Sequence, residues 1–519
     1  MSSLPSECDV LVVGGGNAGF SAALSARENG ARNVVLIDKC PEEWAGGNTY
    51  FTAGAFRTVH AGLADLLPLV NNVDAATSKI IDLEPYTPQD FTSDLLRVTA
   101  GRSDPHLGST LVGDSNDAVK WLHKHGVRFQ LSFNRQAYKV VGRYKFWGGM
   151  ALKTQDGGKG LMEDLRRAAK RAGVATFFST MAKQLVTDAE GTVIGVVAAS
   201  TDISSAHSTS SISAKAVILT AGGFEANPRM RAQYLGPGWD LALVRGTPYN
   251  TGDGLEFAMR DVGAKQAGHW SGCHSRRPGR LHEFTKSGYP LGVVVNTQGE
   301  RFVDEGVDLR NYTYAKFGRA IMGQPDGQSF QVWDARGTPW LRDEEYRDSI
   351  VRKIRADTLE ELADKLAREE GLHSPAKFLE TMHDYNAATN AFQAAHPRVR
   401  WDPAVRDGVS TQSSRGGLAL PKSNWALPID KGPFVAVKVA CGVTFTFGGL
   451  AVNPQTAAVV AAGNREVPGL FCAGEMLGGL FYGNYPGGSG LTSGTVFGRQ
   501  AGRAAAPRAM ASSSVRSNL

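Results

Sequence analysis

A glycine-rich loop between two short apolar segments near the start of the chain most restricts how it can fold. The loop, Gly14-Gly15-Gly16-Asn17-Ala18-Gly19, follows the β-branched run of residues 9–13 and precedes a predicted helix over residues 20–29. A second apolar run, 33–37, ends on Asp38. A buried strand, a G-x-G-x-x-G loop and a helix in this order predict a parallel βαβ unit that binds a dinucleotide.

The positions within this loop have separate physical tasks. Gly14 permits the tight turn, Gly16 lets a pyrophosphate approach the main chain, and Gly19 lets the helix pack closely on the strand. The N–H groups at the start of the helix would face the phosphates. Asp38 could accept hydrogen bonds from ribose hydroxyls. The alternative is an ordinary glycine-rich βα turn, but the flanking strand, helix and acidic residue favour an ADP-containing ligand.

The composition is typical of a globular protein of about two to three domains. The 519 residues include 56 Lys+Arg and 50 Asp+Glu without a block of like charges, so neither nucleic acid nor a membrane surface is expected as a partner. Five scattered cysteines without a C-x-x-C pair predict a reducing compartment and no metal or iron–sulfur site.

The sequence has no apolar segment of the kind found in transmembrane helices or secretory signal peptides. No run of 18 apolar residues and no charged segment followed by an apolar stretch at the N-terminus occur, so we expect no membrane span and no secretory signal. A cytoplasmic location is the expectation. The alternative is peroxisomal, because Ser517-Asn518-Leu519 resembles the S-K-L address.

Changes in amino-acid composition and in secondary-structure pattern along the chain predict its domain boundaries. Strand patterns at 175–178, 182–188, 193–199 and 216–220 continue the nucleotide-binding unit. Beyond about residue 263, aromatic and charged residues are mixed, and helical patterns rich in Arg, Glu and Lys follow. From about residue 437 the sequence again shows strand patterns and many glycines. The expected layout is a nucleotide-binding domain in two segments, 1–262 and 437–519, with a capping or substrate domain, 263–436, inserted between them.

Four pieces of the sequence resemble one family in the order in which they occur. They are the GGGNAG loop, the loop of residues 45–49, ILTAGGFE (218–225) and GLFCAGEMLGG (469–479). Together they resemble the FAD-dependent fumarate reductase/succinate dehydrogenase flavoprotein superfamily. The resemblance implies an α/β fold, with a Rossmann-like FAD-binding domain (GR2 type, parallel sheet plus β-meander) and an inserted α+β capping domain.

Three further stretches look closest to the tricarballylate dehydrogenase-like branch of this superfamily. They are NTQGERFVDEG, DLRNYTYAKFGR (308–319) and NYPGGSGLTSG (484–494). This resemblance implies an enzyme that exchanges a hydride between flavin N5 and a carbon next to a carbonyl group, while a side chain moves a proton at the neighbouring carbon.

The resemblance also implies which residues contact the flavin. Glu475 matches a residue that bonds a ribityl hydroxyl, unless it only caps a surface loop. The last helix would begin beneath the flavin N1/C2 oxygen, where its dipole stabilises the reduced anionic flavin. The implied FAD-binding residues are Gly14, Gly16, Asn17, Ala18, Gly19, Asp38, Lys39, Gly46, Gly47, Asn48, Thr49, Gly54, Gly160, Ala182, Ala221, Gly222, Gly223, Asn250, Asp253, Gly474, Glu475, Ser489, Gly490, Leu491 and Thr492.

The FAD is expected to be non-covalent. Succinate dehydrogenases carry a flavin-linking histidine at the position where this chain has Asn48. An amide has no ring nitrogen with which to form that bond.

The residue that moves the proton, by motif position, is Arg310. An arginine is a reluctant proton donor and needs a relay. Glu283 and Lys286 stand roughly where the family has a Glu and an Arg for this purpose, although Lys286 departs from the family pattern. The alternative for Arg310 is a structural ion pair with Asp304 or Glu305.

A histidine and two departures bear on the substrate. His274, or His269 in another register, matches a substrate-binding histidine, and its alternative is a buried polar residue without function. Fumarate reductases hold one substrate carboxylate with a His and an Arg, where this chain has Phe445 and Tyr485. Loss of both residues removes the bidentate hydrogen bonding by which a guanidinium binds a carboxylate. Tyr485 in its Tyr-Pro-Gly loop resembles the tyrosine that donates to a ketone oxygen in ketosteroid dehydrogenases.

The leading hypothesis is an FAD-dependent oxidoreductase acting on a CH–CH bond next to a carboxylate or ketone, in either direction. One rival is a Δ1-ketosteroid-type or secondary-metabolite dehydrogenase with a larger apolar substrate. Another is a flavin-binding subunit without turnover. Since no C-x-x-C-H haem motif occurs, electrons are expected to pass to or from a separate protein, a quinone or oxygen.

Overall fold

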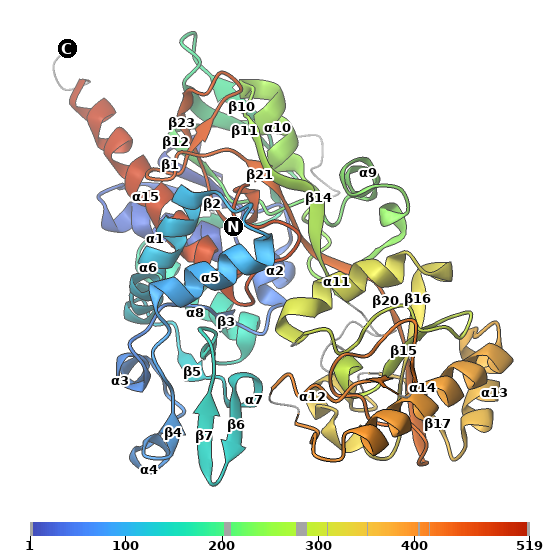
Figure 1. The fold of residues 1–519 in the computed structure, drawn as a ribbon. Helices are drawn as coiled ribbons and strands as arrows, with labels where there is room; N and C mark the ends of the chain where they lie inside the picture. Colours follow the sequence, from blue (N-terminus) through green and yellow to red (C-terminus); the bar gives the residue numbers. More distant parts are fainter. Residues whose placement is uncertain are drawn as a thin grey trace. The chain divides into compact units, whose positions relative to one another are not determined.

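The computed structural model describes residues 4–201, 209–276, 288–308, 310–349, 351–402, 405–414 and 416–515 (Figure 1). The chain forms two compact units. The first comprises Met1–Asp240, Gly246–His274 and Phe445–Leu519, and the second comprises Leu241–Arg245 and Ser275–Thr444. Each unit has a hydrophobic core of its own. Among the residues described, no helix is long and apolar enough to cross a membrane.

An eight-stranded sheet forms the centre of the first unit. Its main path is β10-β11-β12-β1-β2-β9, and β23, which carries β22, pairs with β12. The pairs β1–β12, β1–β2, β2–β9 and β12–β23 are parallel, whereas β10–β11 and β11–β12 are antiparallel. This confirms the predicted parallel sheet with a β-meander. The strands are β1 (Glu7–Val13), β2 (Val34–Ile37), β9 (Ala175–Phe177), β10 (Thr180–Thr187), β11 (Val193–Ser200), β12 (Thr209–Leu219), β22 (Ala458–Val460) and β23 (Glu466–Cys472).

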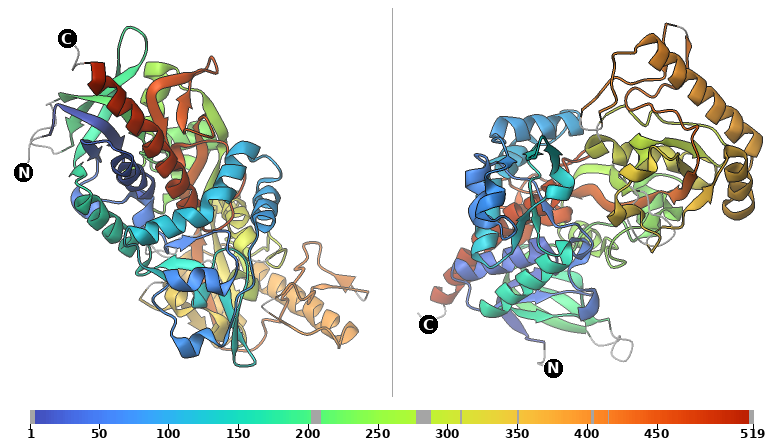
Figure 2. Two further views of the ribbon diagram at one scale, coloured as in Figure 1. Left: turned by 90° about the vertical axis from the view of Figure 1, so that its left-hand side faces the viewer. Right: turned by 90° about the horizontal axis from the view of Figure 1, so that it is seen from below.

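The last helix of the chain completes the first unit by packing on the first helix. Figure 2 shows α15 (Ser489–Val515, red) lying beside α1 (Asn17–Glu28, dark blue). Gly498 and Gly502 lie one turn apart on the contact face of α15. A Cβ atom built on Gly498 would lie 2.5 Å from the Ala18 carbonyl oxygen. Glycines therefore allow the two helix backbones to approach closely.

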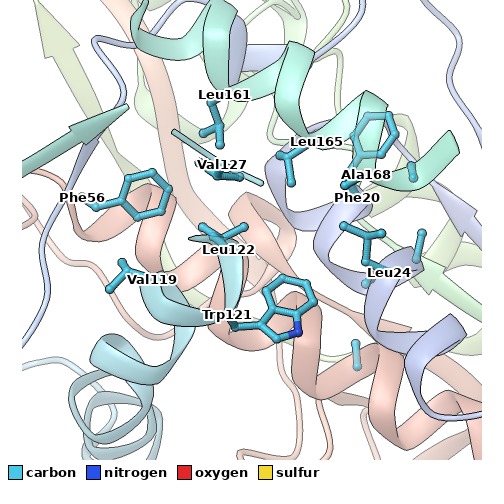
Figure 3. Close-up of a cluster of buried hydrophobic side chains, with 14 of the residues drawn as sticks. Phe20, Leu24, Phe56, Val119, Trp121, Leu122, Val127, Leu161, Leu165 and Ala168 are labelled. Atoms are coloured by element: carbon cyan, nitrogen blue, oxygen red, sulfur yellow. The ribbon is translucent and has the colours of Figure 1, made fainter. Parts of the chain in front are cut away.

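Two more helices cover α1 and close the core on that side of the sheet. Leu161 and Leu165 of α8 (Gly157–Arg171) pack near Leu122 of α6 (Pro105–Lys124) and the α1 side chains (Figure 3). Full burial of one such leucine contributes about 1.5–3 kcal/mol. These contacts fix the start of α1, and with it the glycine-rich loop.

Shorter elements surround this framework. The helices are α2 (Gly47–Tyr50), α3 (Leu63–Leu66), α4 (Ala75–Ser78), α5 (Pro88–Thr99), α7 (Phe133–Gln136), α9 (Pro228–Met230) and α10 (Asp253–Val262). The strands are β3 (Ala55–Phe56), β4 (Ile81–Asp82), β5 (Phe129–Leu131), β6 (Ala137–Val140), β7 (Arg143–Phe146) and β8 (Leu152–Thr154).

The second unit is built on a four-stranded antiparallel sheet of order β15-β16-β20-β17. Helices α13 and α14 contribute much of its core, so the unit is α+β, as predicted. Its elements are β13 (Leu243–Val244), β15 (Val293–Asn296), α11 (Arg310–Met322), β16 (Gln328–Trp333), α12 (Asp343–Tyr346), β17 (Ile354–Ala356), α13 (Leu359–Glu370), α14 (Pro375–Ala395), β18 (Gln412–Ser413), β19 (Gly416–Gly417) and β20 (Phe434–Ala440).

The unit boundaries fall inside two long strands, β14 (Gln266–Arg276) and β21 (Gly442–Leu450). They therefore differ by about ten residues from the expected 263–436. A change in amino-acid composition does not locate a boundary that falls inside a strand. Both β14 and β21 continue from one unit into the other without a break.

Candidate active site

The glycine-rich loop has the backbone geometry that a pyrophosphate requires. Gly14 has φ +107°, and a Cβ atom on it would lie 2.4 Å from the Thr220 carbonyl oxygen. A Cβ atom on Gly19 would lie 1.9 Å from the Gly14 carbonyl oxygen. On Gly16, by contrast, the nearest atoms would be 3.7 Å away. Gly14 and Gly19 are thus needed by the fold, while Gly16 keeps one side of the main chain open for a ligand.

Asp38 stands at the end of β2, and its carboxylate is held in a fixed orientation. It accepts hydrogen bonds from the main-chain N–H groups of Gly15 (2.7 Å) and Cys40 (3.0 Å). The next residue, Lys39, pairs with Asp253 and Thr251. The structure therefore brings together two of the predicted contacts, Lys39 and Asp253, beside the predicted ribose-binding acid.

The start of α1 is tied to α2 and to α15. The Asn17 N–H donates to Thr49 Oγ1 (3.1 Å). The Asn17 side-chain amide donates to the Leu491 carbonyl oxygen (2.8 Å) and to Thr495 Oγ1 (3.1 Å). The predicted phosphate loop and the predicted flavin-facing helix terminus thus share one hydrogen-bonded contact.

Two glutamates, Glu225 and Glu475, lie together beyond the ends of β12 and β23. Asn250 Nδ2 donates to Glu225 Oε1 at 2.7 Å and to Glu475 Oε2 at 3.5 Å. The Thr446 N–H donates to Glu475 Oε1 (2.7 Å). A Cβ atom on Gly223 would lie 2.2 Å from Glu475 Oε1, which explains the glycine. Glu475 is half-buried and anchored, so it does not cap a surface loop.

Asn48 uses both ends of its side chain within the protein. Its Nδ2 donates to Glu225 Oε1 (2.6 Å), and its Oδ1 accepts from the Thr247 N–H (3.1 Å). The residue at the expected flavin-linking position therefore joins the predicted flavin loop to the acidic pair.

An aromatic cluster surrounds the predicted substrate residues. The ring of Tyr485 lies edge-on to those of His274 and Phe445, each with centroids 4.8 Å apart. The rings of His274 and Phe445 are 5.3 Å apart, and Phe481 is 5.6 Å from Tyr485. His274 is buried. The alternative histidine, His269, accepts from the Gly483 N–H (2.9 Å) and stacks on Tyr482 instead.

Arg57 is a buried residue of this region that the sequence analysis missed. Its guanidinium donates to the Gly487 carbonyl oxygen (2.9 Å), to the Tyr86 hydroxyl (2.7 Å) and to Asp94 (2.7 Å). Arg57 thereby fixes the loop that carries Tyr485. It lies in a short irregular segment, so neither periodicity nor a motif marks it.

The other predicted flavin contacts fall into two groups. Gly46, Gly47, Gly54 and Gly160 lie where α2 approaches the start of α8, and Gly46, Gly47 and Gly54 have positive φ. The remainder lie on β10, after β12, at the start of the 3₁₀ helix Gly474–Met476, or in the first turn of α15; they are Ala182, Ala221, Gly222, Gly474, Ser489, Gly490 and Thr492.

The predicted proton relay is described only in part. Glu283 and Lys286 lie outside the described residues, as do Ser517–Leu519. Arg310 is the first residue of α11. Asp304 and Glu305, the alternative partners of Arg310, have described contacts with other residues.

Both carboxylates belong to the NTQGERFVDEG stretch, which forms a buried ionic cluster in the second unit. Glu305 pairs with Arg301 and accepts from the Val294 N–H (2.8 Å), and Asp304 accepts from Ser423. Lys422 donates to the Gly292 carbonyl oxygen, and burial lowers its pKa to about 8. This stretch therefore stabilises the core of its unit.

Comparisons with known proteins agree with this geometry. Residues 9–491 match the family described as FAD binding domain. A probable fumarate reductase, Ifc3, of Shewanella frigidimarina is 29% identical over 98% of this chain and 76% of its own length. A 4-oxocyclohex-2-ene-1-carboxylate 5-dehydrogenase of Sinomonas cyclohexanicum is 25% identical over 96% of this chain and 93% of its own. The open conformation of a flavocytochrome c3 fumarate reductase has a TM-score of 0.73 and 27% identity, covering 97% of this chain and 79% of that one.

The fold and the site define a flavoprotein oxidoreductase. The chain belongs to the FAD-binding family within the fumarate reductase/succinate dehydrogenase flavoprotein superfamily, and FAD is its cofactor. It is an FAD-dependent enzyme of the class that acts on CH–CH or C=C bonds. The open side of Gly16, the fixed carboxylate of Asp38 and the half-buried Glu475 fit the pyrophosphate, ribose and ribityl chain of FAD. When bound, FAD supplies the hydride acceptor or donor.

Proposed function

We propose that this enzyme is a tricarballylate dehydrogenase-like oxidoreductase acting on a CH–CH bond next to a carboxylate or ketone. The observation that carries the proposal is the contact of Tyr485 with His274 and Phe445. Two polar groups, the Tyr485 hydroxyl and the imidazole of His274, stand beside aromatic carbon. Such a site can orient the carbonyl oxygen of one carboxylate or ketone of the substrate beside aromatic side chains.

The residues divide the work in the proposed reaction. The Tyr485 hydroxyl and His274 hold the carbonyl oxygen, which makes the neighbouring C–H bond more acidic by stabilising negative charge on that oxygen. In reduction Arg310 donates a proton to that carbon and regains one through Glu283 and Lys286. Dehydrogenation runs these steps in reverse, so Arg310 first passes a proton to the relay and then accepts the one that leaves the carbon. The hydride leaves from, or arrives at, the adjacent carbon. Electrons then pass to or from an external protein, a quinone or oxygen.

The same cluster supports a second candidate, a Δ1-ketosteroid-type dehydrogenase with a larger apolar substrate. Phe445 contacts Phe447 (5.2 Å between centroids), and Phe481 lies 6.3 Å from Phe447. Aromatic side chains on this scale provide apolar area for a ring system. The two candidates differ in the size of the substrate and not in the chemistry of the carbonyl group.

A substrate screen tests both candidates. The holoenzyme is mixed without oxygen with tricarballylate, succinate, cyclic ketones and 3-ketosteroids, and loss of the oxidised-flavin absorbance is followed. We expect bleaching by tricarballylate or a cyclic ketone and slower bleaching by succinate. Fastest bleaching by a steroid would favour the second candidate. Fastest bleaching by succinate would contradict the proposed role of the aromatic cluster.

A double variant tests the cluster directly. Phe445→His with Tyr485→Arg restores the two residue types that hold a carboxylate in fumarate reductases. We expect preference to shift toward succinate and fumarate, since a bidentate guanidinium bond favours a carboxylate. The control is Tyr482→Phe, which changes a nearby tyrosine that stacks on His269 instead. Unchanged preference in the double variant would place substrate recognition elsewhere.

A further inference from the structure

Two acidic side chains, Glu225 and Glu475, meet in the first unit. Glu225 is fully buried, Glu475 is half-buried, and both contact the same amide nitrogen of Asn250. Within the described part of the chain, neither carboxyl group belongs to an ion pair. Two negative charges held this close without a counter-charge strongly disfavour each other.

Among the residues that the structure describes, the side chains and N–H groups that donate to the two carboxyl groups are neutral, and one carboxylate oxygen accepts no hydrogen bond. Glu225 Oε1 accepts from Asn48 and Asn250, and Glu475 Oε1 accepts from the N–H and hydroxyl groups of Thr446. Among the described residues, Glu225 Oε2 is buried with no hydrogen-bond partner. A buried carboxylate oxygen in that condition costs about 1–3 kcal/mol or more, unless it carries a proton.

The arginine that acts electrostatically on Glu225 donates its hydrogen bonds to main-chain oxygens. Arg231 interacts electrostatically with Glu225, but its N–H groups donate to main-chain carbonyl oxygens of Glu225, Trp239 and Asp240. The segments that bring Asn48, Asn250 and Thr446 to the carboxyl groups contribute amides and a hydroxyl. A proton is therefore the remaining way to lower the negative charge at this point.

We infer that Glu225 and Glu475 share one proton, carried on Glu225 Oε2, and that FAD binds to this singly protonated pair. The proton gives Oε2 a donor role toward Glu475 and leaves the pair with one negative charge. Glu475 can then accept a hydrogen bond from the ribityl chain, while Asn48 and Asn250 hold Glu225 in place.

Burial raises the pKa of both carboxyl groups. Burial, and then the negative charge of Glu475, raise the pKa of Glu225 well above its ordinary value. Burial also raises the pKa of Glu475, although hydrogen bonds from Thr446 oppose this. Glu225 is therefore the member that keeps the proton at neutral pH, and raising the pH through its pKa removes it.

Infrared spectroscopy of the holoenzyme tests the protonation state. We expect the C=O stretching band of a protonated carboxylic acid at neutral pH, shifted in D₂O, and its loss in Glu225→Gln. The glutamine amide can donate to Glu475 in place of the O–H group. The control is Asp164→Asn, which removes a buried carboxylate paired with Arg128 and Arg167 and should leave the band unchanged. A wild type without the band, or Glu225→Gln with it, overturns the inference.

The affinity for FAD as a function of pH gives a second readout that does not use turnover. If binding requires the shared proton, affinity falls by about tenfold for each pH unit above the pKa of the pair. Glu225→Gln should lose this fall, and Asp164→Asn should keep it. A wild-type affinity that is independent of pH, or the same fall in Glu225→Gln, overturns the inference. The infrared spectrum and the pH dependence of FAD affinity in the wild type test the inference even if Glu225→Gln does not fold.

Discussion

The side-chain amide of Asn17 donates to the carbonyl oxygen of Leu491 at 2.8 Å, although the two residues are 474 positions apart in the sequence. Asn17 begins the first helix and Leu491 lies in the first turn of the last. Because one nitrogen joins the two helix termini, the phosphate end and the flavin end of the site depend on how closely α1 and α15 pack.

Gly498→Ala should therefore destabilise the enzyme, although alanine favours helix in general. The added Cβ would lie 2.5 Å from the Ala18 carbonyl oxygen, so α15 would have to move away from α1. Overpacking of this kind costs about 1–3 kcal/mol. Gly113→Ala is the matched control, since it lies inside helix α6 with nothing within 4 Å of its Cβ position. Denaturant unfolding should show a loss in the first variant and none in the second.

Gly16→Ala should weaken FAD binding without unfolding the protein. Gly16 has φ −84°, which alanine adopts readily, and its Cβ would meet no protein atom closer than 3.7 Å. The methyl group would occupy the space that the pyrophosphate needs, so affinity should fall at least about tenfold, or 1.4 kcal/mol. Gly19→Ala, whose Cβ would lie 1.9 Å from the Gly14 carbonyl oxygen, should destabilise the apoprotein itself. Flavin fluorescence titration and thermal unfolding separate the two effects; full FAD affinity in Gly16→Ala would contradict the position assigned to the loop.

The flavin should be released by acid precipitation. Asn48 offers no ring nitrogen for a covalent link, and both ends of its side chain are engaged with Glu225 and Thr247. Free FAD should appear in the supernatant, measured by its absorbance and fluorescence. Flavin that stays with the protein on a denaturing gel would show a covalent bond elsewhere.

Arg57→Lys should loosen the loop that carries Tyr485 while leaving FAD bound. A lysine cannot reach the Gly487 carbonyl oxygen, the Tyr86 hydroxyl and Asp94 together, because it lacks the planar fork. Loss of these buried hydrogen bonds should cost about 1–3 kcal/mol in unfolding and raise KM for the substrate. Arg97→Lys is the control, since Arg97 pairs with the same Asp94 from the exposed side. Its effect should stay within about 0.5 kcal/mol.

The parts of the fold that could be predicted from sequence are those in which the residue pattern of a short segment is sufficient to determine its secondary structure. The βαβ unit was predictable because β-branched strands and the glycine-rich loop follow each other directly. The serine-rich sequence of residues 204–213 is typical of a loop, but β12 begins at Thr209 and pairs with β11. Pairing with a neighbouring strand outweighs the weak strand propensity of serine.

The site was predictable where a motif fixes a residue and not where packing does. Glu225 and Glu475 each lie in a recognisable stretch, but their pairing depends on Asn48 and Asn250, which approach from other elements. The start of α6 was also missed. The helical pattern is clear only over residues 117–125, yet the helix begins at Pro105, where Asp104 caps the N–H groups of His106 and Leu107. The Asp-Pro pair carried that signal.

The proposed mechanism depends on which residue moves the proton. If Arg310 does so, Arg310→Ala should leave FAD bound and lower turnover by about 10²–10⁴-fold, with a much smaller change in substrate affinity. Arg310→Lys should restore little, because lysine differs in reach and geometry. Tyr485→Phe keeps the ring contacts with His274 and Phe445 and removes only the hydroxyl. It should cost less, about 10- to 10³-fold. Single-turnover flavin reduction measures each step directly. If Arg310→Ala kept more than about a tenth of wild-type turnover while Tyr485→Phe was inactive, the proton would pass through Tyr485, and the reaction would resemble that of the ketosteroid dehydrogenases.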